Sequence, residues 1–235
     1  MPIGIIINVL SVVLGGLTGA IVGNRLSPKV KEEMNLIFGI CAMGMGMGSV
    51  CLMQNMPAVV FSVIVGSFVG LSLKIGQRIQ TLTGKALKGI LKNSDPETED
   101  MMLTAVVLFC VSGTGIYGSL ESGMTGNHSI LIAKAVLDFF TAMIFACKLG
   151  KITALIGVPQ FVIMIALFFL AKVIVPMTTD MMISDFKACG GLILLATGLR
   201  MLQLKPSPIA DMIPAMILVM PISYAWTTWL QPLFG

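Results

Sequence analysis

Long apolar runs separated by short polar connections are the dominant pattern of this sequence. Eight runs can be drawn, at about residues 3–23, 34–53, 57–73, 101–117, 130–147, 152–175, 188–204 and 209–230. Most are close to the roughly 20 residues that an α-helix needs to cross the hydrocarbon core of a bilayer. The pattern predicts an all-α, polytopic membrane protein with about eight transmembrane helices in a single transmembrane domain, residues 1–235.

The composition supports this interpretation and limits the chemistry. Hydrophobic residues make up 56% of the 235 positions and charged residues only 11%, and the mean hydropathy is +0.97. Soluble domains carry about a quarter charged residues. The spans use nearly the whole chain, and the sequence contains one histidine, no phosphate-binding loop, no zinc-protease motif and no nucleophile elbow. We therefore expect neither an enzyme nor a bound cofactor or metal.

The basic residues fall mainly in the short connections after the first, third, fifth and seventh runs. Twelve of the 15 Lys and Arg lie there, namely Arg25, Lys29, Lys31, Lys74, Arg78, Lys85, Lys88, Lys92, Lys148, Lys151, Arg200 and Lys205. Positive residues favour the cytoplasmic side, so this distribution predicts that both termini are extracytoplasmic. It also accounts for the net charge of +4 without nucleic acid as a partner.

The longest polar connection, residues 74–100, is predicted to be a cytoplasmic loop. Its first part places Ile75, Ile79 and Leu82 at near-helical spacing with basic residues between them. This is typical of a short amphipathic helix lying on an anionic lipid surface. The lipid bilayer is thus the first expected partner.

Three of the runs carry glycines four residues apart. These are Gly15, Gly19 and Gly23 in the first run, Gly44 and Gly48 in the second, and Gly66 and Gly70 in the third. On a helix each set lies on one face, where it lets another backbone approach closely. We expect close helix packing at these faces, and a second copy of the chain is a further expected partner through them.

One stretch, residues 110–138, combines membrane-length apolar sequence with glycines and ionisable groups. Gly113, Gly115, Gly118, Gly123 and Gly126 fall within fourteen residues. Each costs a helix roughly 1 kcal/mol relative to Ala. The stretch is therefore predicted to be a glycine-broken, unwound segment, which inside a membrane persists only within protein or beside a water-filled cavity.

Asp138 is the strongest single candidate for a functional residue. It lies about eight residues inside the fifth run, roughly 12 Å along a helix and close to mid-membrane, where a carboxylate is costly. Lys134 lies one turn earlier on the same face and can neutralise it. Two interpretations remain open, a charged transport site and a structural ion pair.

Further polar groups at or near membrane depth complete the candidate set. Glu121 and Asn127 lie in or next to the glycine-rich stretch, Asn8 in the first run and Asp211 at the start of the eighth. With Gly113, Gly115, Lys134 and Asp138 they form the predicted transport site. Glu121 could equally be an acceptor for a cation or proton or an ordinary surface acid. Asn127 could also be a helix cap.

Four segments carry a family resemblance. They read FCVSGTGIYGSLESGMTGNHSILIAKAVLDFFTAMIFACKLG, PIGIIINVLSVVLGGLTGAIVG, GGLILLATGLRML and DMIPAMILVMPIS. The chain resembles the YqgA and YdfK type of bacterial inner-membrane proteins, a family without an assigned activity. The resemblance implies a multi-helix fold in the bacterial inner membrane and no substrate. Asn127 and Asp211 depart from the family pattern, which has Asp and Asn there.

Two functions remain open on these observations. The leading hypothesis is a transporter or channel-like protein for a small solute or ion, with the unwound segment and the N-terminus of the fifth helix forming a polar site around Lys134 and Asp138. The alternative is a structural or regulatory membrane component without transport activity, whose charges only fix helix packing.

Overall fold

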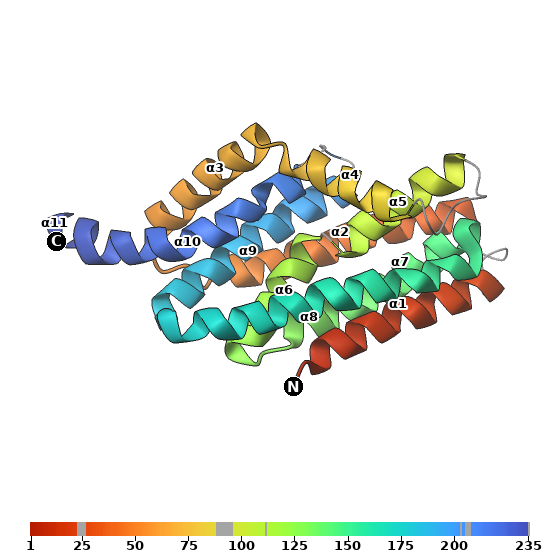
Figure 1. Ribbon diagram of the computed structural model, residues 1–235, viewed down its shortest axis with the longest axis horizontal. Helices are drawn as coiled ribbons and strands as arrows, with labels where there is room; N and C mark the ends of the chain where they lie inside the picture. Colours follow the sequence, from red (N-terminus) through yellow and green to blue (C-terminus); the bar gives the residue numbers. More distant parts are fainter. Residues whose placement is uncertain (23–26, 88–95, 111, 203, 205–207, 235) are drawn as a thin grey trace. The chain divides into compact units, whose positions relative to one another are not determined.

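The computed structural model describes residues 1–22, 27–87, 96–110, 112–202, 204 and 208–234. These residues are overwhelmingly helical and contain no β-strand (Figure 1). The principal helices are α1 (Ile3–Val22), α2 (Pro28–Val50), α3 (Met56–Ser72), α4 (Ile75–Leu87), α5 (Pro96–Cys110), α6 (Gly113–Thr125), α7 (Ser129–Leu149), α8 (Gly157–Ile174), α9 (Asp180–Met201) and α10 (Ile213–Ala225). Two 3₁₀ segments, η2 (Gly150–Ile156) and η4 (Ile209–Met212), precede α8 and α10, and a π-helical turn, η5 (Trp226–Leu230), and α11 (Gln231–Phe234) follow α10.

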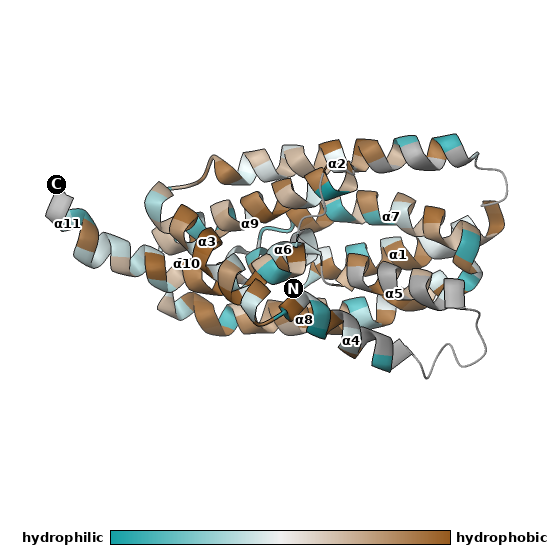
Figure 2. Cartoon of the chain, turned by 90° about the horizontal axis from the view of Figure 1, so that it is seen from above, coloured by the Kyte–Doolittle hydropathy of each residue, from teal (hydrophilic) through white to brown (hydrophobic). Residues whose placement is uncertain are grey.

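Several of the described helices are long and apolar enough for a membrane. In the described part of the chain, four segments meet the length and hydropathy of a span, Ile3–Val22, Ser129–Met177, Asp180–Met201 and Ile209–Leu230. Leu36–Val50 and Met56–Ser72 are shorter apolar helices. Apolar residues colour much of each of these helices in Figure 2. The predicted all-α membrane protein is confirmed, while the number of spans stays a prediction.

The predicted unwound segment is wrong for residues 113–125, which form α6. Ser112 caps this helix by accepting a hydrogen bond from the Gly115 amide, and Gly126 ends it in the left-handed conformation, with φ +72°. The fourth predicted run is therefore divided between α5 and α6. Because a Cβ at Gly118 would lie 2.9 Å from the Leu131 side chain, and one at Gly123 would meet α8, these glycines let α6 pack closely. Packing offsets their low helix propensity.

Residues 1–38 and 78–173 form one compact unit, unit 1. In it α1 and α7 run side by side in the same direction (Figure 1). A Cβ at Gly15 would lie 3.1 Å from Ala142 Cβ, and one at Gly19 would lie 2.8 Å from Ala146 Cβ. The glycine face predicted for α1 thus packs on α7, whereas Gly23 lies outside the described residues.

Residues 39–77 and 174–235 form a second compact unit, unit 2. Gly66 and Gly70 of α3 pack against Ala215 at the start of α10 and against the backbone of Asp211 in η4. On α2, however, nothing lies within 4 Å of a Cβ at Gly44 or Gly48, so the close packing expected there is absent within the described chain. Other glycines of α2 make the close helix contact.

Helix packing between α2 and α9 uses a different set of glycines. A Cβ at Gly46 would lie 2.7 Å from the Gly191 carbonyl oxygen, and one at Gly39 would lie 3.0 Å from that of Gly198. The glycine pattern therefore predicted the kind of contact but assigned it to the wrong face of α2.

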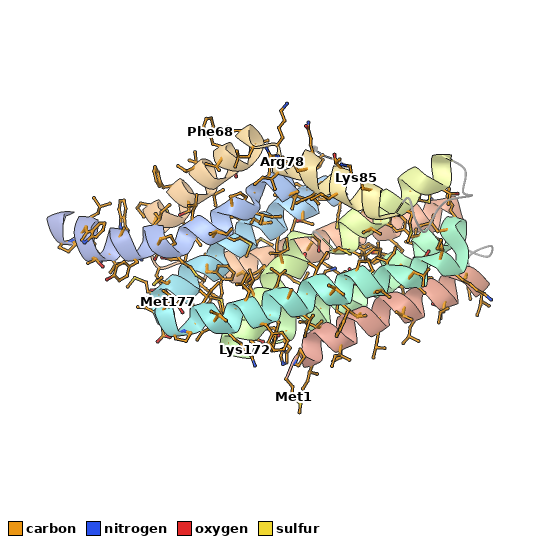
Figure 3. All side chains as sticks on the ribbon, in the orientation of Figure 1. Met1, Phe68, Arg78, Lys85, Lys172 and Met177 are labelled. Carbon is orange, nitrogen blue, oxygen red and sulfur yellow. The ribbon has the colours of Figure 1, made fainter. Side chains whose placement is uncertain are left out.

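Helix α4 lies within the predicted loop 74–100, and residues 88–95 of that loop are outside the described residues. Lys74, with φ 52°, separates α4 from α3. Arg78 and Lys85 are exposed, and Figure 3 labels both on this helix. Figure 3 also shows Phe68 among the side chains on the outer side of α3, where it is 70% exposed. Such exposed apolar side chains are those expected of a lipid-facing surface.

Candidate functional site

Lys134 and Asp138 form a buried ion pair in the middle of α7. The side chains are 4% and 10% exposed, and Lys134 Nζ donates to Asp138 Oδ2. Asn8 of α1 donates through Nδ2 to the same carboxylate oxygen at 2.9 Å. Gln160 of α8 donates through Nε2 to Asp138 Oδ2 at 3.2 Å and to Asn8 Oδ1 at 2.8 Å. Three helices thus supply one polar cluster, the pair cluster: Asn8, Lys134, Asp138 and Gln160.

The pair cluster keeps hydrogen-bonding capacity that its own members do not use. Gln160 is fully buried, and its Oε1 has no hydrogen-bond partner among the described residues. An ammonium group has three N–H donors. Within the described chain Lys134 Nζ makes the single hydrogen bond to Asp138, and the Phe109 ring centroid lies 5.8 Å away. Buried polar capacity of this kind is costly unless a partner satisfies it, so the cluster is suited to a small polar species.

A helix junction lies beside the pair cluster. Helix α5 ends at Cys110 and α6 begins at Gly113, after its cap Ser112. Phe109 stacks edge-on to Phe145 in the second half of α7, with ring centroids 6.1 Å apart. A Cβ at Gly115 would lie 3.2 Å from Lys134 Cε. The junction between the two helices is therefore at the level of the ion pair.

The N-terminus of α6, and not that of α7, lies beside the ion pair. The N-terminus of α7 was expected there, but Asp138 lies nine residues after Ser129, about 14 Å along the helix. The first turn of α6 is the nearer one, through Gly115. A helix N-terminus carries a partial positive charge and favours anions. The α6 N-terminus and the Lys134 ammonium therefore make this side of the cluster electropositive.

Two apolar clusters flank the pair cluster. The Leu131 cluster consists of Ile5, Leu131, Met164 and Phe168. The Phe109 cluster consists of Val12, Met102, Ala105, Val106, Phe109, Cys110, Ala142, Leu149 and Ile156. On α1 and α7, members of the two clusters precede and follow the polar residues along the helix, and Ile156 of η2 precedes Gln160 while Met164 and Phe168 follow it on α8. The ion pair is thus enclosed between apolar layers.

The predicted site residues fall into three separate groups. Asn8, Gly115, Lys134 and Asp138 come together, and Gly113 begins the adjacent helix α6. Glu121 and Asn127 lie at the other end of α6, where Asn127 Nδ2 donates to Glu121 Oε1 at 3.4 Å. Asp211 belongs to unit 2, and its Oδ1 accepts from the Gly76 amide at 2.8 Å, which caps α4. It is not part of the pair cluster.

Sequence reasoning missed Gln160 although a signal for it existed. It is the one amide side chain in the apolar run 152–175, and it is fully buried in α8. A lone amide at membrane depth faces the protein interior, where it forms interhelical hydrogen bonds. Attention to this residue type would have placed it with Asn8.

A second buried carboxylate, Asp185 of α9, was also missed. It lies just before the predicted seventh run and is fully buried in unit 2. Its Oδ1 accepts from the amides of Gln54 at 2.8 Å and Asn55 at 2.9 Å, and its Oδ2 accepts from Asn55 Nδ2 at 3.0 Å and Ser223 Oγ at 2.5 Å. These donors surround the N-terminus of α3, so Asp185 acts as a helix-capping anion.

Metal ligands do not gather at either carboxylate. The residues that the structure describes contain no group of three His, Cys, Asp or Glu side chains with the proximity of a metal site.

Comparison with known proteins agrees with this membrane architecture. The family described as "Protein of unknown function (DUF554)" matches residues 3–224. The chain is 43% identical over 234 residues to the uncharacterized protein YqgA of Escherichia coli, covering 97% of this chain and 99% of that protein. It is 22% identical over 221 residues to the uncharacterized membrane protein YdfK of Bacillus subtilis, covering 92% and 93%. No solved structure matches. The chain therefore belongs to the DUF554 family.

Proposed function

We propose that this protein is a transporter or channel-like protein of the bacterial inner membrane that moves a small solute or ion through the pair cluster. The observation that carries the proposal is the buried Lys134 and Asp138 pair beside the junction of α5 and α6. Ionisable groups inside a membrane protein are expensive to bury and commonly mark ion or substrate pathways. Helix ends that point at such groups recur in transporter sites.

The chemistry of the cluster limits what it can bind. The Lys134 ammonium and the α6 N-terminus favour an anionic group, whereas Asp138 and the Gln160 carbonyl oxygen favour a cation or a proton. The ligand is thus either a small carboxylated metabolite or a monovalent ion. In both cases it competes with the internal ion pair, so binding and separation of Lys134 from Asp138 are coupled.

The alternative function is a structural or regulatory membrane component. It is supported by the internal hydrogen bonds of the cluster, because Asp138 Oδ2 has donors from three helices and can hold them together. Under this alternative, substitutions at the pair lower stability and change no flux.

A flux measurement on purified protein in lipid vesicles separates the two functions. The vesicles contain a trapped pH-sensitive dye, and gradients of Na⁺, K⁺, Cl⁻ or acetate are imposed in turn. We expect flux with the unmodified chain. Folded Asp138→Asn and Lys134→Met variants should lose it, because each removes one of the two charged side chains that the solute or ion would bind.

Asp185→Asn is the matched control for loss of a buried carboxylate. Asp185 caps α3 within unit 2, so this variant should lose stability but keep its flux per folded molecule. Folded protein without flux under all four gradients, with Asp138→Asn and Lys134→Met also folded, would favour the structural function.

A further inference from the structure

The Leu131 cluster separates the ion pair from one end of unit 1. At that end α6 turns into α7, and Ser122 Oγ lies 2.7 Å from His128 Nδ1. A Cβ at Gly4 would lie 3.0 Å from His128 Cβ, so α1 begins at the same end. Among the described residues the cluster has four fully or almost fully buried members, whereas nine form the Phe109 cluster on the other side. The apolar barrier toward the α6–α7 turn is therefore formed by fewer of the described side chains.

One face of α6 carries small and polar residues along this barrier. Ser112, Gly115, Ser119 and Ser122 follow one another at intervals of three, four and three, which places them on the same side of a helix. Gly115 at one end meets Lys134 and Met164, and Ser122 at the other end meets His128. The face, here called the serine face, thus extends from the ion pair to the turn.

Ser119 in the middle of the serine face has an unsatisfied hydroxyl. It is fully buried, and its Oγ has no hydrogen-bond partner among the described residues. Its helical position lies between Gly118, which faces Leu131 of α7, and Gly123, which faces α8. On the helix, Ser119 therefore lies between the position that faces α7 and the position that faces α8, at the level of the Leu131 cluster. A buried hydroxyl without a hydrogen-bond partner is costly, which favours a state in which it is solvated.

We propose that the serine face of α6 is the aqueous access path to the ion pair, closed in this structure by the Leu131 cluster. When the cluster opens, water enters from the α6–α7 turn, and protons or a small hydrophilic solute follow it to Lys134 and Asp138. Ser122 and Ser119 line the path, and the unpartnered Gln160 Oε1 lies at its inner end. This inference rests on the proposed transport function but concerns solvent access alone.

Thiol labelling tests the path without requiring a known solute. Full-length Ser119→Cys protein in vesicles is treated with a small membrane-impermeant cationic methanethiosulfonate, and mass spectrometry reads modification at residue 119, so the native cysteines can stay. The matched control is Val136→Cys, which lies on α7 between Lys134 and Asp138 and is 58% exposed on the outer surface. A thiol forms its reactive thiolate in water and only poorly in apolar surroundings. A hydrated path therefore predicts that residue 119 reacts about tenfold faster than residue 136.

A second pair of variants tests the apolar barrier itself. Leu131→Ala thins the Leu131 cluster, and Ile156→Ala removes a side chain of equal size from the Phe109 cluster; both residues are fully buried. Because truncation leaves a cavity, Leu131→Ala should raise labelling at residue 119 by about threefold or more, while Ile156→Ala leaves it unchanged. The reagent should act from the side that carries the chain's N-terminus.

The outcomes are distinguishable from those of the flux measurement. Equal, slow labelling at residues 119 and 136, or equal effects of Leu131→Ala and Ile156→Ala, would overturn the access path. Labelling at residue 119 without solute flux would keep the path and count against transport. If Ser119→Cys does not fold, Ser112→Cys at the inner end of the serine face replaces it, with labelling again expected to increase with Leu131→Ala.

Discussion

At Asp138 one carboxylate oxygen accepts from three side chains, so the ion pair is one part of a shared arrangement. Removing Lys134 leaves a buried anion whose remaining donors in the described part of the chain are the amides of Asn8 and Gln160. Removing Asp138 leaves a buried ammonium beside the Phe109 ring. At the scale of single residues, each partner therefore matters mostly through the cost of leaving the other one alone.

This predicts strong coupling in a double-mutant cycle. Lys134→Met and Asp138→Leu should each destabilise the detergent-solubilised protein by about 3 to 5 kcal/mol, and the double variant should lose less than the sum of the two. Unfolding free energies of the four proteins measure the coupling. Additive losses would show that the two side chains do not stabilise each other and would contradict the ion pair as the organising interaction of the site.

The glycines allow a second prediction at this scale. A Cβ at Gly19 would lie 2.8 Å from Ala146 Cβ and would also meet the backbone of Met143, whereas one at Gly44 has open space around it. Gly19→Ala should therefore force α1 from α7 and cost about 1 to 3 kcal/mol. Gly44→Ala should be neutral or stabilise by up to about 1 kcal/mol through helix propensity. Unfolding measurements in which both changes have the same effect would contradict this.

At the scale of elements, hydropathy predicted where helices lie better than where they break. Apolar length indicated α1, α3, α7, α8 and α10, because a membrane selects for it directly. Glycine content in residues 113–126 predicted an unwound backbone, but α6 is helical. Helix propensity is a local quantity, and the contacts of Gly118 and Gly123 with α7 and α8 are tertiary contacts that no local pattern contains.

The difference between local patterns and tertiary contacts also decides how much of the candidate site could be predicted. The Lys134 and Asp138 pair follows from helical spacing alone, and Asn8 follows from its depth in an apolar run. Gln160 could have been recognised as the one amide in its apolar run, but the mean hydropathy of the run hides a single polar residue. Asp185 could not be recognised, because its role depends on the N-terminus of α3, about 130 residues earlier in the chain. Asp211 was assigned to the site by depth, but in unit 2 it accepts a hydrogen bond from the Gly76 amide at the start of α4.

At the scale of the whole molecule, the two compact units share a plan. In unit 1 Asp138 accepts from Asn8, and in unit 2 Asp185 accepts from Asn55, and each Asp follows its Asn by 130 residues. In each unit the Asn belongs to or caps an early helix, and the Asp lies on a helix followed by a 3₁₀ segment and another helix.

The difference between the units lies one turn before each aspartate. Unit 1 has Lys134 there and unit 2 has Met181, which accepts a hydrogen bond from Thr227 at 3.0 Å. In unit 2 the amides at the α3 N-terminus satisfy the carboxylate in place of a lysine. The shared plan thus provides a carboxylate held by backbone amides in one unit and an ion pair in the other. This contrast is why Asp185→Asn is the informative control for Asp138→Asn.

The orientation of the chain in the membrane connects the basic residues to the access path. With twelve of the 15 Lys and Arg in connections on one side, both termini should be extracytoplasmic and the connection containing α4 cytoplasmic. A periplasmic phosphatase fused after Gly235 should be active, and a fluorescent protein that folds only in the cytoplasm should be bright after Leu87 and dark after Gly235.

Because Gly4 packs on His128, the N-terminal end of α1 and the α6–α7 turn lie at the same end of unit 1. The methanethiosulfonate should therefore reach residue 119 from outside the cell. Fluorescence after Gly235 would reverse the orientation and would require labelling from the cytoplasmic side.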